Sequence, residues 1–235
     1  MMKTQYKRTY HQRLHQVLQQ FNSSYLNDHC ILFGGGTRIA LELDEYRQSV
    51  DIDFFCVGKN AFRAVRSVVT ETTLGDLVRQ DFNYPRDIRA DRDAVRCFIS
   101  DQDIVIKLEF VFFLDELINV DTQDTFPVPA IDRTSCYLTK LLANADRYNT
   151  PPYKDIFDLL AMFNQWGEIP EQAWHQAEEH YGQKAIWHGL DKAYRQIKQQ
   201  PQKYSEIATQ ELDISLDYAR HLLNTVLDQL YQSIK

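Results

Sequence analysis

The chain has 235 residues, enough to bury the core of one or two domains, and its 44% hydrophobic and 25% charged residues are ordinary for a globular protein. The net charge of -7 argues against avid, non-specific nucleic-acid binding, although it leaves room for a local basic patch. No apolar run approaches the roughly 18–20 residues of a membrane-spanning helix, and the basic N-terminus lacks the apolar stretch of a secretory signal. We therefore expect a cytoplasmic protein that makes no membrane contact, and these bulk properties do not identify its function.

The cysteines and histidines do not predict a metal centre. The four cysteines are scattered without CxxC spacing, and most have apolar neighbours: Cys30, Cys56, Cys97 and Cys136. We expect buried free thiols in a reducing compartment, and neither a zinc site nor a disulfide framework. The seven histidines also lack ligand spacing.

Hydrophobic periodicity predicts helices and strands in the first half of the chain and helices alone in the second. The first half is expected to hold helices at 5–21, 37–45 and 60–72 and strands at 30–33, 49–55, 76–82, 94–100 and 103–113. After Pro127 and Pro129, helices are expected at 131–148, 153–166, 170–180, 182–199 and 212–233. This order predicts an α+β protein with a helical C-terminal domain, divided into residues 1–128 and 129–235.

The most informative segment runs from Gly34 to Phe55, where a glycine turn opens a helix and a strand with two carboxylates follows. Side chains alternate faces along a strand, so Asp51 and Asp53 point the same way while the apolar residues between them point into the core. Two adjacent like charges persist most readily when a divalent cation neutralises them, and Mg²⁺ binds carboxylates together with substrate phosphates. Backbone N–H groups at a helix N-terminus suit a phosphate. The segment therefore predicts chemistry on a nucleoside triphosphate.

Two other phosphate-binding patterns fit less well. A dinucleotide-binding Rossmann turn would need a third glycine where Ile39 stands, and ribose binding needs one carboxylate where this strand carries two. A P-loop would need Gly-Lys-Ser/Thr, which does not follow the glycines.

Four motifs in order resemble the AbiEii/AbiGii toxin branch of the DNA polymerase β-like nucleotidyltransferase superfamily. The first motif is Gly35-Gly36-Thr37 followed by Arg47, Ser49, Asp51, Asp53 and Phe54, with thirteen residues between Thr37 and Asp51. The other three are Lys107-Leu108-Glu109, then Lys140-Leu141-Leu142-Ala143 with Arg147, and last Lys154-Asp155-Ile156-Phe157-Asp158-Leu159. Lys154 stands where the family usually has arginine. The resemblance covers roughly residues 30–165.

This resemblance implies a mixed sheet flanked by helices, the nucleotidyltransferase fold, in residues 1–128, and a helical domain that closes the nucleotide cleft in residues 129–235. It implies Mg²⁺ or Mn²⁺ held by Asp51, Asp53 and Glu109, with Glu109 also able to accept a proton. The nucleotide-binding residues would be Gly35, Gly36, Thr37, Arg47, Ser49 and Lys140, with Ser49 bonding near the strand backbone and Arg47 orienting a carboxylate. Asp158 would be required for catalysis, with Asp155 beside it.

The implied reaction moves an NMP from an NTP to a hydroxyl of RNA, such as tRNA, or of a protein. The chain would be the toxin of a bacterial toxin–antitoxin pair, with a cognate antitoxin as partner. Two alternatives stay open: a protein phosphotransferase on the same fold, and a non-catalytic module that binds a nucleotide or a partner.

Two groups of basic residues are candidates for an RNA-backbone patch. Lys59, Arg63 and Arg66 lie on one face of an expected helix. In the second group, interspersed aspartates largely cancel the charge, so we expect a solvated surface there: Arg79, Arg86, Arg89, Arg92 and Arg96. Arg38, next to the glycine turn, is expected either to contact phosphate or to face solvent.

Overall fold

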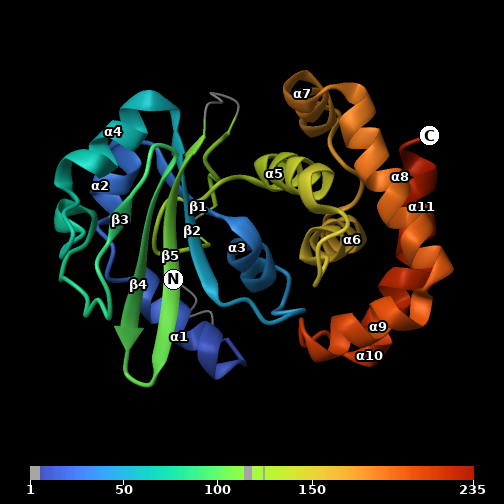
Figure 1. The fold of residues 1–235 in the computed structure, drawn as a ribbon, viewed down its shortest axis with the longest axis horizontal. Coiled ribbons are helices and arrows are strands. Elements are labelled where there is room, and N and C mark those ends of the chain that lie inside the picture. The colour runs from blue at the N-terminus through green and yellow to red at the C-terminus, as the bar shows by residue number, and fades with distance from the viewer. Residues whose placement is uncertain (1–5, 114–117, 124) are drawn as a thin grey trace. The chain divides into compact units, whose positions relative to one another are not determined.

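The computed structural model describes residues 6–113, 118–123 and 125–235, and the chain forms two compact units. One consists of Met1–Arg38 and Val50–Asp132 and contains the β-sheet; we call it the sheet unit. The other consists of Ile39–Ser49 and Arg133–Lys235, and we call it the helical unit. Figure 1 shows the course of the chain through both. Neither unit is one continuous stretch of chain.

A five-stranded mixed sheet forms the centre of the sheet unit, in the order β1-β2-β5-β4-β3. The strands are β1 (Ile31–Gly34), β2 (Asp51–Val57), β3 (Arg89–Ala90), β4 (Ala94–Asp101) and β5 (Ile104–Phe113). β2 and β5 run parallel, and the other neighbouring pairs are antiparallel. The strands expected at 94–100 and 103–113 are confirmed as β4 and β5, which form an antiparallel hairpin, and the expected α+β class is confirmed as well.

The alternation predicted for β2 is confirmed by burial, and β5 shows the same pattern. Ile52 and Phe54 are fully buried, whereas Asp51 and Asp53 are partly exposed on the other face. On β5, Leu108 and its even-numbered neighbours are buried, while the odd-numbered positions from 107 to 111 are partly exposed. Apolar side chains thus pack on one face of the central strands and leave the carboxylates on the other.

Helices α1 (Thr9–Leu18), α2 (Ser23–Asp28) and α4 (Gly58–Val68) belong to the sheet unit, and α4 contacts both β2 and β5. Figure 1 shows α2 and α4 beside the sheet. The expected strand at 76–82 is wrong: a short 3-10 turn, η1 (Gly75–Leu77), occupies its start, and Val78 makes only an isolated bridge to Phe21. The sequence analysis also missed α2 and β3, both of which are short.

The helical unit is organised around α5 (Arg133–Arg147), which contacts α6 (Lys154–Trp166), α7 (Glu171–Tyr181) and α8 (Gln183–Gln199). α9 (Pro201–Gln210) lies between the helices expected at 182–199 and 212–233 and was not expected; Pro201 occupies its first turn, where proline is tolerated. The last helical stretch consists of α10 (Leu216–His221), a π turn, η2 (Leu222–Val226), and α11 (Leu227–Ser233). Helix α3 (Gly35–Glu42) begins in the sheet unit and ends in the helical unit.

The cysteines are free thiols, as expected, but one of them is not buried. Cys56, Cys97 and Cys136 are buried, whereas Cys30 is exposed and has a positive φ of 53° at the turn before β1. Among the described residues, none of the helices combines the length and apolar character needed to cross a membrane.

Candidate functional site

The glycine turn at the end of β1 lies directly against the Asp-x-Asp strand. Gly34 is paired with Asp53 in the antiparallel register of β1 and β2. Gly35 follows with a φ of +70°, and a Cβ atom added to it would clash with Asp53 Oδ2. Only glycine fits there without strain, because the conformation is left-handed and the backbone approaches the carboxylate closely.

A hydroxyl of the first turn of α3 ties that helix to the other aspartate. Thr37 is buried, and its Oγ1 donates a hydrogen bond to the backbone carbonyl of Asp51. The predicted turn, helix start and acidic strand therefore form one local structure within the sheet unit. Asp51 also acts on Tyr10: burial raises the pKa of the Tyr10 phenol, and the charge of Asp51 raises it further.

Glu109 lies beside this pair but already has two cationic partners. It is the register partner of Asp53 across β2 and β5, so the two side chains stand on one face of neighbouring strands, about 5 Å apart at the backbone. Arg96 Nε donates to Glu109 Oε1 at 2.6 Å, and Lys107 Nζ donates to Oε2. Burial tends to raise the pKa of the Glu109 carboxyl, but these bonds and charges hold that pKa below its usual value.

The donor atoms of the sheet unit suit a hard divalent cation only in part. Asp51 and Asp53 are partly exposed carboxylates on one strand face, which is the ligand type that Mg²⁺ prefers. In the part of the chain that the structure describes, no group of three or more His, Cys, Asp or Glu side chains is placed to hold a metal ion. Two carboxylates thus fit Mg²⁺, and Glu109 would first have to leave its two ion pairs.

In the helical unit, Asp158 on α6 is the centre of a buried hydrogen-bond network. Arg47 donates to it twice, from Nε to Oδ1 at 2.7 Å and from Nη2 to Oδ2 at 3.1 Å. The Tyr46 hydroxyl donates to Oδ1, and Lys140 Nζ lies 2.6 Å from Oδ2. Asp158 is 0% exposed, so these donors replace water completely.

Asp155, one turn earlier on α6, extends the network to the end of α5. Lys140 Nζ donates to Asp155 Oδ1 at 2.8 Å, and Arg147 donates to both oxygens. Lys140 is 4% exposed, whereas the Arg147 side chain is 46% exposed. We call these six side chains the buried network: Tyr46, Arg47, Lys140, Arg147, Asp155 and Asp158.

The network stabilises the charged form of each carboxylate and of the lysine. Burial would raise the pKa of Asp158, but the charges of Arg47 and Lys140 outweigh burial and lower it. The same balance, with Lys140 and Arg147 as partners, holds the pKa of Asp155 far below its usual value. Burial would lower the pKa of Lys140, yet the two aspartates raise it above its usual value.

Two further hydrogen bonds, outside the buried network, hold the segment Ile39–Ser49 in the helical unit. Gln48 N–H donates to the carbonyl of Leu212 at 2.9 Å, and Arg133 Nε donates to Glu42 Oε1 at 2.7 Å. Arg47 binds the carboxylate of Asp158, and its expected contact with the nucleotide stays a prediction.

Arg38 behaves differently from expectation. Its side chain is 0% exposed, so it does not face solvent. Nη2 donates to Asp121 Oδ2 at 3.1 Å, and the guanidinium lies 5.7 Å from the centre of the Phe126 ring. Because Asp121 is far away in the sequence, no local pattern indicated this pairing.

Sequence reasoning also missed Tyr46 and Arg96 as site residues. Tyr46 carries no motif signal beyond its position next to Arg47, and its hydroxyl is used only because α6 presents Asp158 to it. Arg96 was grouped with the solvated arginines, although the register of β4 and β5 places it opposite Glu109. A cross-strand pairing of the expected hairpin would have found it.

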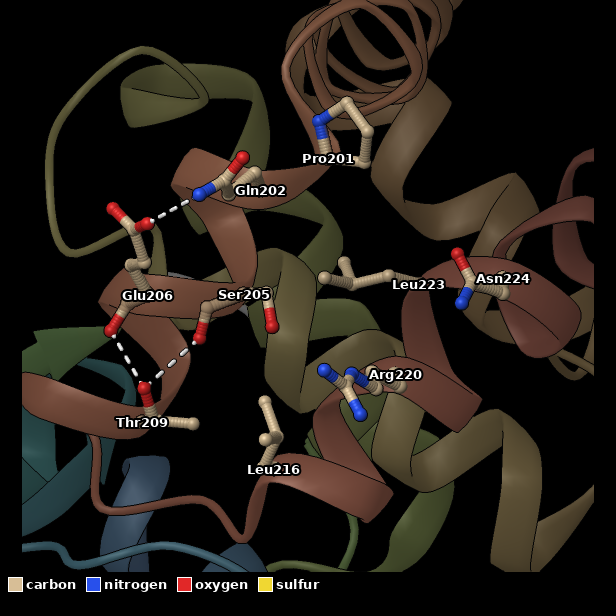
Figure 2. A pocket seen from close by; sticks show the side chains of 9 residues that line it. All are labelled: Pro201, Gln202, Ser205, Glu206, Thr209, Leu216, Arg220, Leu223 and Asn224. Atoms are coloured by element: carbon tan, nitrogen blue, oxygen red, sulfur yellow. Dashed lines mark hydrogen bonds between the residues drawn. The ribbon is translucent and has the colours of Figure 1, made fainter.

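A cavity of about 450 Å³ in the helical unit contains none of the predicted site residues. Figure 2 shows it between α9 and the stretch from α10 to η2, with the guanidinium of Arg220 directed into it. Gln202 Nε2 donates to Glu206 Oε1 at 3.0 Å, and the Thr209 hydroxyl bonds the backbone of the preceding turn. The polar groups of Gln202, Glu206 and Thr209 are thus bonded within α9, and the cavity lies apart from the predicted phosphate-binding residues.

The mixed sheet, with its glycine turn against an Asp-x-Asp strand, together with the helical C-terminal region, defines a nucleotidyltransferase fold. The chain is similar to a Helicobacter pylori protein provisionally assigned as a nucleotidyltransferase, with 17% identity and a TM-score of 0.56 over 95% of this chain and 94% of that one. It is similarly related to JHP933 from Helicobacter pylori, with 17% identity and a TM-score of 0.54 over 94% and 92% of the two chains.

The family follows from the sequence. The family model of the AbiEii nucleotidyl transferase toxins of type IV toxin–antitoxin systems matches residues 16–232. The chain belongs to this family, which confirms the resemblance seen in its motifs. A comparison with curated proteins finds no match.

Proposed function

We propose that the protein is a Mg²⁺-dependent nucleotidyltransferase that moves an NMP from an NTP to a hydroxyl of RNA or of a protein. The observation that carries the proposal is the contact of the Gly35 backbone with the carboxylate of Asp53, on a strand that also presents Asp51. A phosphate-binding turn and a pair of metal-binding carboxylates are the two parts that transfer from a nucleoside triphosphate requires.

Each group of candidate site residues in the sheet unit has a part in this reaction. Asp51 and Asp53 would hold Mg²⁺, which when bound offsets the negative charge of the triphosphate. The N–H groups of the glycine turn would bind phosphate oxygens. The acceptor oxygen forms a bond to the α-phosphorus, the bond from that phosphorus to the bridging oxygen breaks, and pyrophosphate leaves. The hydroxyl proton passes to a carboxylate, for which Glu109 is the candidate.

Asp158 is required, in our proposal, as a positioning residue. It holds Tyr46 and Arg47, which lie in the middle of the segment that joins α3 to β2. Its two oxygens accept hydrogen bonds from groups of the protein itself, namely Tyr46, Arg47 and Lys140, and the side chain is fully buried. Lys140 shares this environment, so its predicted contact with the nucleotide stays a prediction.

Label placement tests the reaction. NTPs labelled with radioactive phosphorus at the α position are incubated with Mg²⁺, the protein and total RNA, in parallel with γ-labelled NTPs. Transfer of α-label to RNA or to protein, lost in Asp51→Asn and Asp53→Asn, is expected. Transfer of γ-label alone would mean that the chain is a phosphotransferase, and no transfer of either label would refute catalysis under these conditions.

Membership of the toxin family leads us to infer that expression of the protein inhibits bacterial growth and that a cognate antitoxin reverses the inhibition. Growth curves of cells that express the wild type and Asp53→Asn test this inference. Equal growth of the two cultures at equal protein levels would contradict it.

A further inference from the structure

The sheet unit has a basic surface that is separate from the glycine turn. Lys59, Arg63 and Arg66 lie at i, i+4 and i+7 and so form one exposed face of α4. None of these three forms an ion pair with another described residue. They line a groove of about 530 Å³ together with Arg92, whose side chain is 94% exposed. We call this the basic groove.

The basic groove has an aromatic wall and a fixed rim. The rings of Phe62 and Phe112 lie 5.6 Å apart, and Phe112 is only partly buried at the end of β5. The Phe112 N–H donates to the carbonyl of Asp93 at 2.9 Å, which fixes the loop before β4 next to the strand. The Asp93 carboxylate lies 3.3 Å from Arg92 and is the one acidic side chain among the described residues that line the groove.

We propose that the basic groove binds the backbone of a single-stranded RNA, and that this RNA is the acceptor of the transferred nucleotide; the second statement rests on the proposed function. Arginine guanidinium groups match phosphate geometry, and an aromatic face stacks on bases of any sequence. An acidic peptide would use the charges but would gain nothing specific from the Phe112 ring. RNA therefore fits the combination better than an acidic protein does.

The position of the basic groove sets a lower limit on the size of the acceptor. α4 follows the last residue of β2, whereas Asp51 is its first residue, so the two features lie at opposite ends of a strand about 20 Å long. Phe112 is also on the opposite face of the sheet from Glu109, because side chains alternate along β5. A small acceptor cannot reach both places, whereas a polymer can.

Fluorescence anisotropy with a fluorescein-labelled oligouridine of about 16 nucleotides tests the binding. The assay contains no NTP and no divalent metal, so its result does not depend on whether the transfer chemistry is correct. The variant is Arg63→Ala with Arg66→Ala. The matched control is Lys184→Ala with Lys192→Ala, which also removes two exposed cations from one helix, α8.

We expect the variant to bind about 25-fold more weakly at about 0.1 M salt, and the slope of log affinity against log salt to fall by about 1.4, as for two lost phosphate contacts on a single strand. The control should match the wild type. Equal affinity and slope in wild type and variant would overturn the proposal. So would competition by polyglutamate as strong as that by unlabelled RNA at equal charge, because the groove would then accept acidic protein.

Discussion

Replacing Asp158 by asparagine removes one charge from the centre of the buried network with almost no change in shape. The buried network of the wild type has five charged side chains: Arg47, Lys140 and Arg147 are cationic, and Asp155 and Asp158 are anionic. The net charge of the network therefore rises from +1 to +2. In addition, the amide group can accept on one side only, and its NH₂ must face the donors of Arg47 or Lys140.

The expected loss is large because the site is closed to water. Removing one partner of a buried ion pair costs about 3–5 kcal/mol, since the remaining charge stays desolvated. For a domain of this size, that corresponds to a fall in Tm of about 10 °C. Thermal and urea unfolding of Asp158→Asn measure it, and Asp217→Asn, at an exposed position on α10, is the control with the same chemical change.

Stability and activity together decide what Asp158 does. If it positions the segment that carries Tyr46 and Arg47, activity and stability fall together, and osmolytes that restore the fold restore part of the activity. A variant that unfolds within about 0.5 kcal/mol of the wild type, the range of an ordinary surface substitution, and that is nevertheless inactive would refute positioning and favour direct catalysis.

Three further predictions follow from the geometry. Gly35→Ala should lower the free energy of unfolding by about 1–3 kcal/mol more than Gly58→Ala does, as measured by urea unfolding. Both glycines have a positive φ, but only a Cβ at Gly35 would meet the carboxylate of Asp53. Equal losses in the two variants would contradict this prediction. The two aspartates of the buried network have lowered pKa values in the folded state. The stability that they contribute is therefore present above about pH 4, the pKa of an aspartate in the unfolded chain, and is lost as the pH falls through the folded pKa values. Urea titration measures the free energy of unfolding, and a value that stays constant from about pH 5 to about pH 2 would contradict this prediction. Lys107→Met should raise the pKa of Glu109, measured by carbon NMR of the carboxyl, because it removes one of the two bonds to the charged form; an unchanged value would show that the bond is not formed in solution.

Local sequence patterns predicted the parts of the fold in which one face of an element is apolar. The two-residue alternation of β2 is a direct record of which face is buried, and it placed Asp51 and Asp53 on one face; the register of β2 and β5 then brings Glu109 to the same face. The same reasoning failed at residues 76–82. There the apolar side chains of Leu77 and Val78 are buried by a 3-10 turn and an isolated bridge, not by a strand.

The candidate site could be predicted in its residue types but not in its pairings. Asp155 and Asp158 were expected to share a helix face, and their common contact with Lys140 confirms this. The partners from distant parts of the chain were not predictable, because a hydrogen bond of Arg47 to a helix more than a hundred residues later leaves no periodic trace. Burial of Arg38 was missed for the same reason, since a charge is expected inside only when its partner is known.

The assignment of Ile39–Ser49 to the helical unit has a consequence for synthesis of the protein. This segment leaves the ribosome early, but α6, which carries its partner Asp158, and Leu212 are made much later. Until then, Arg47 lacks the carboxylate of Asp158, and Gln48 lacks the carbonyl of Leu212. The segment can therefore make these hydrogen bonds only after most of the helical unit has been synthesised, although the residues on both sides of it in the sequence belong to the sheet unit.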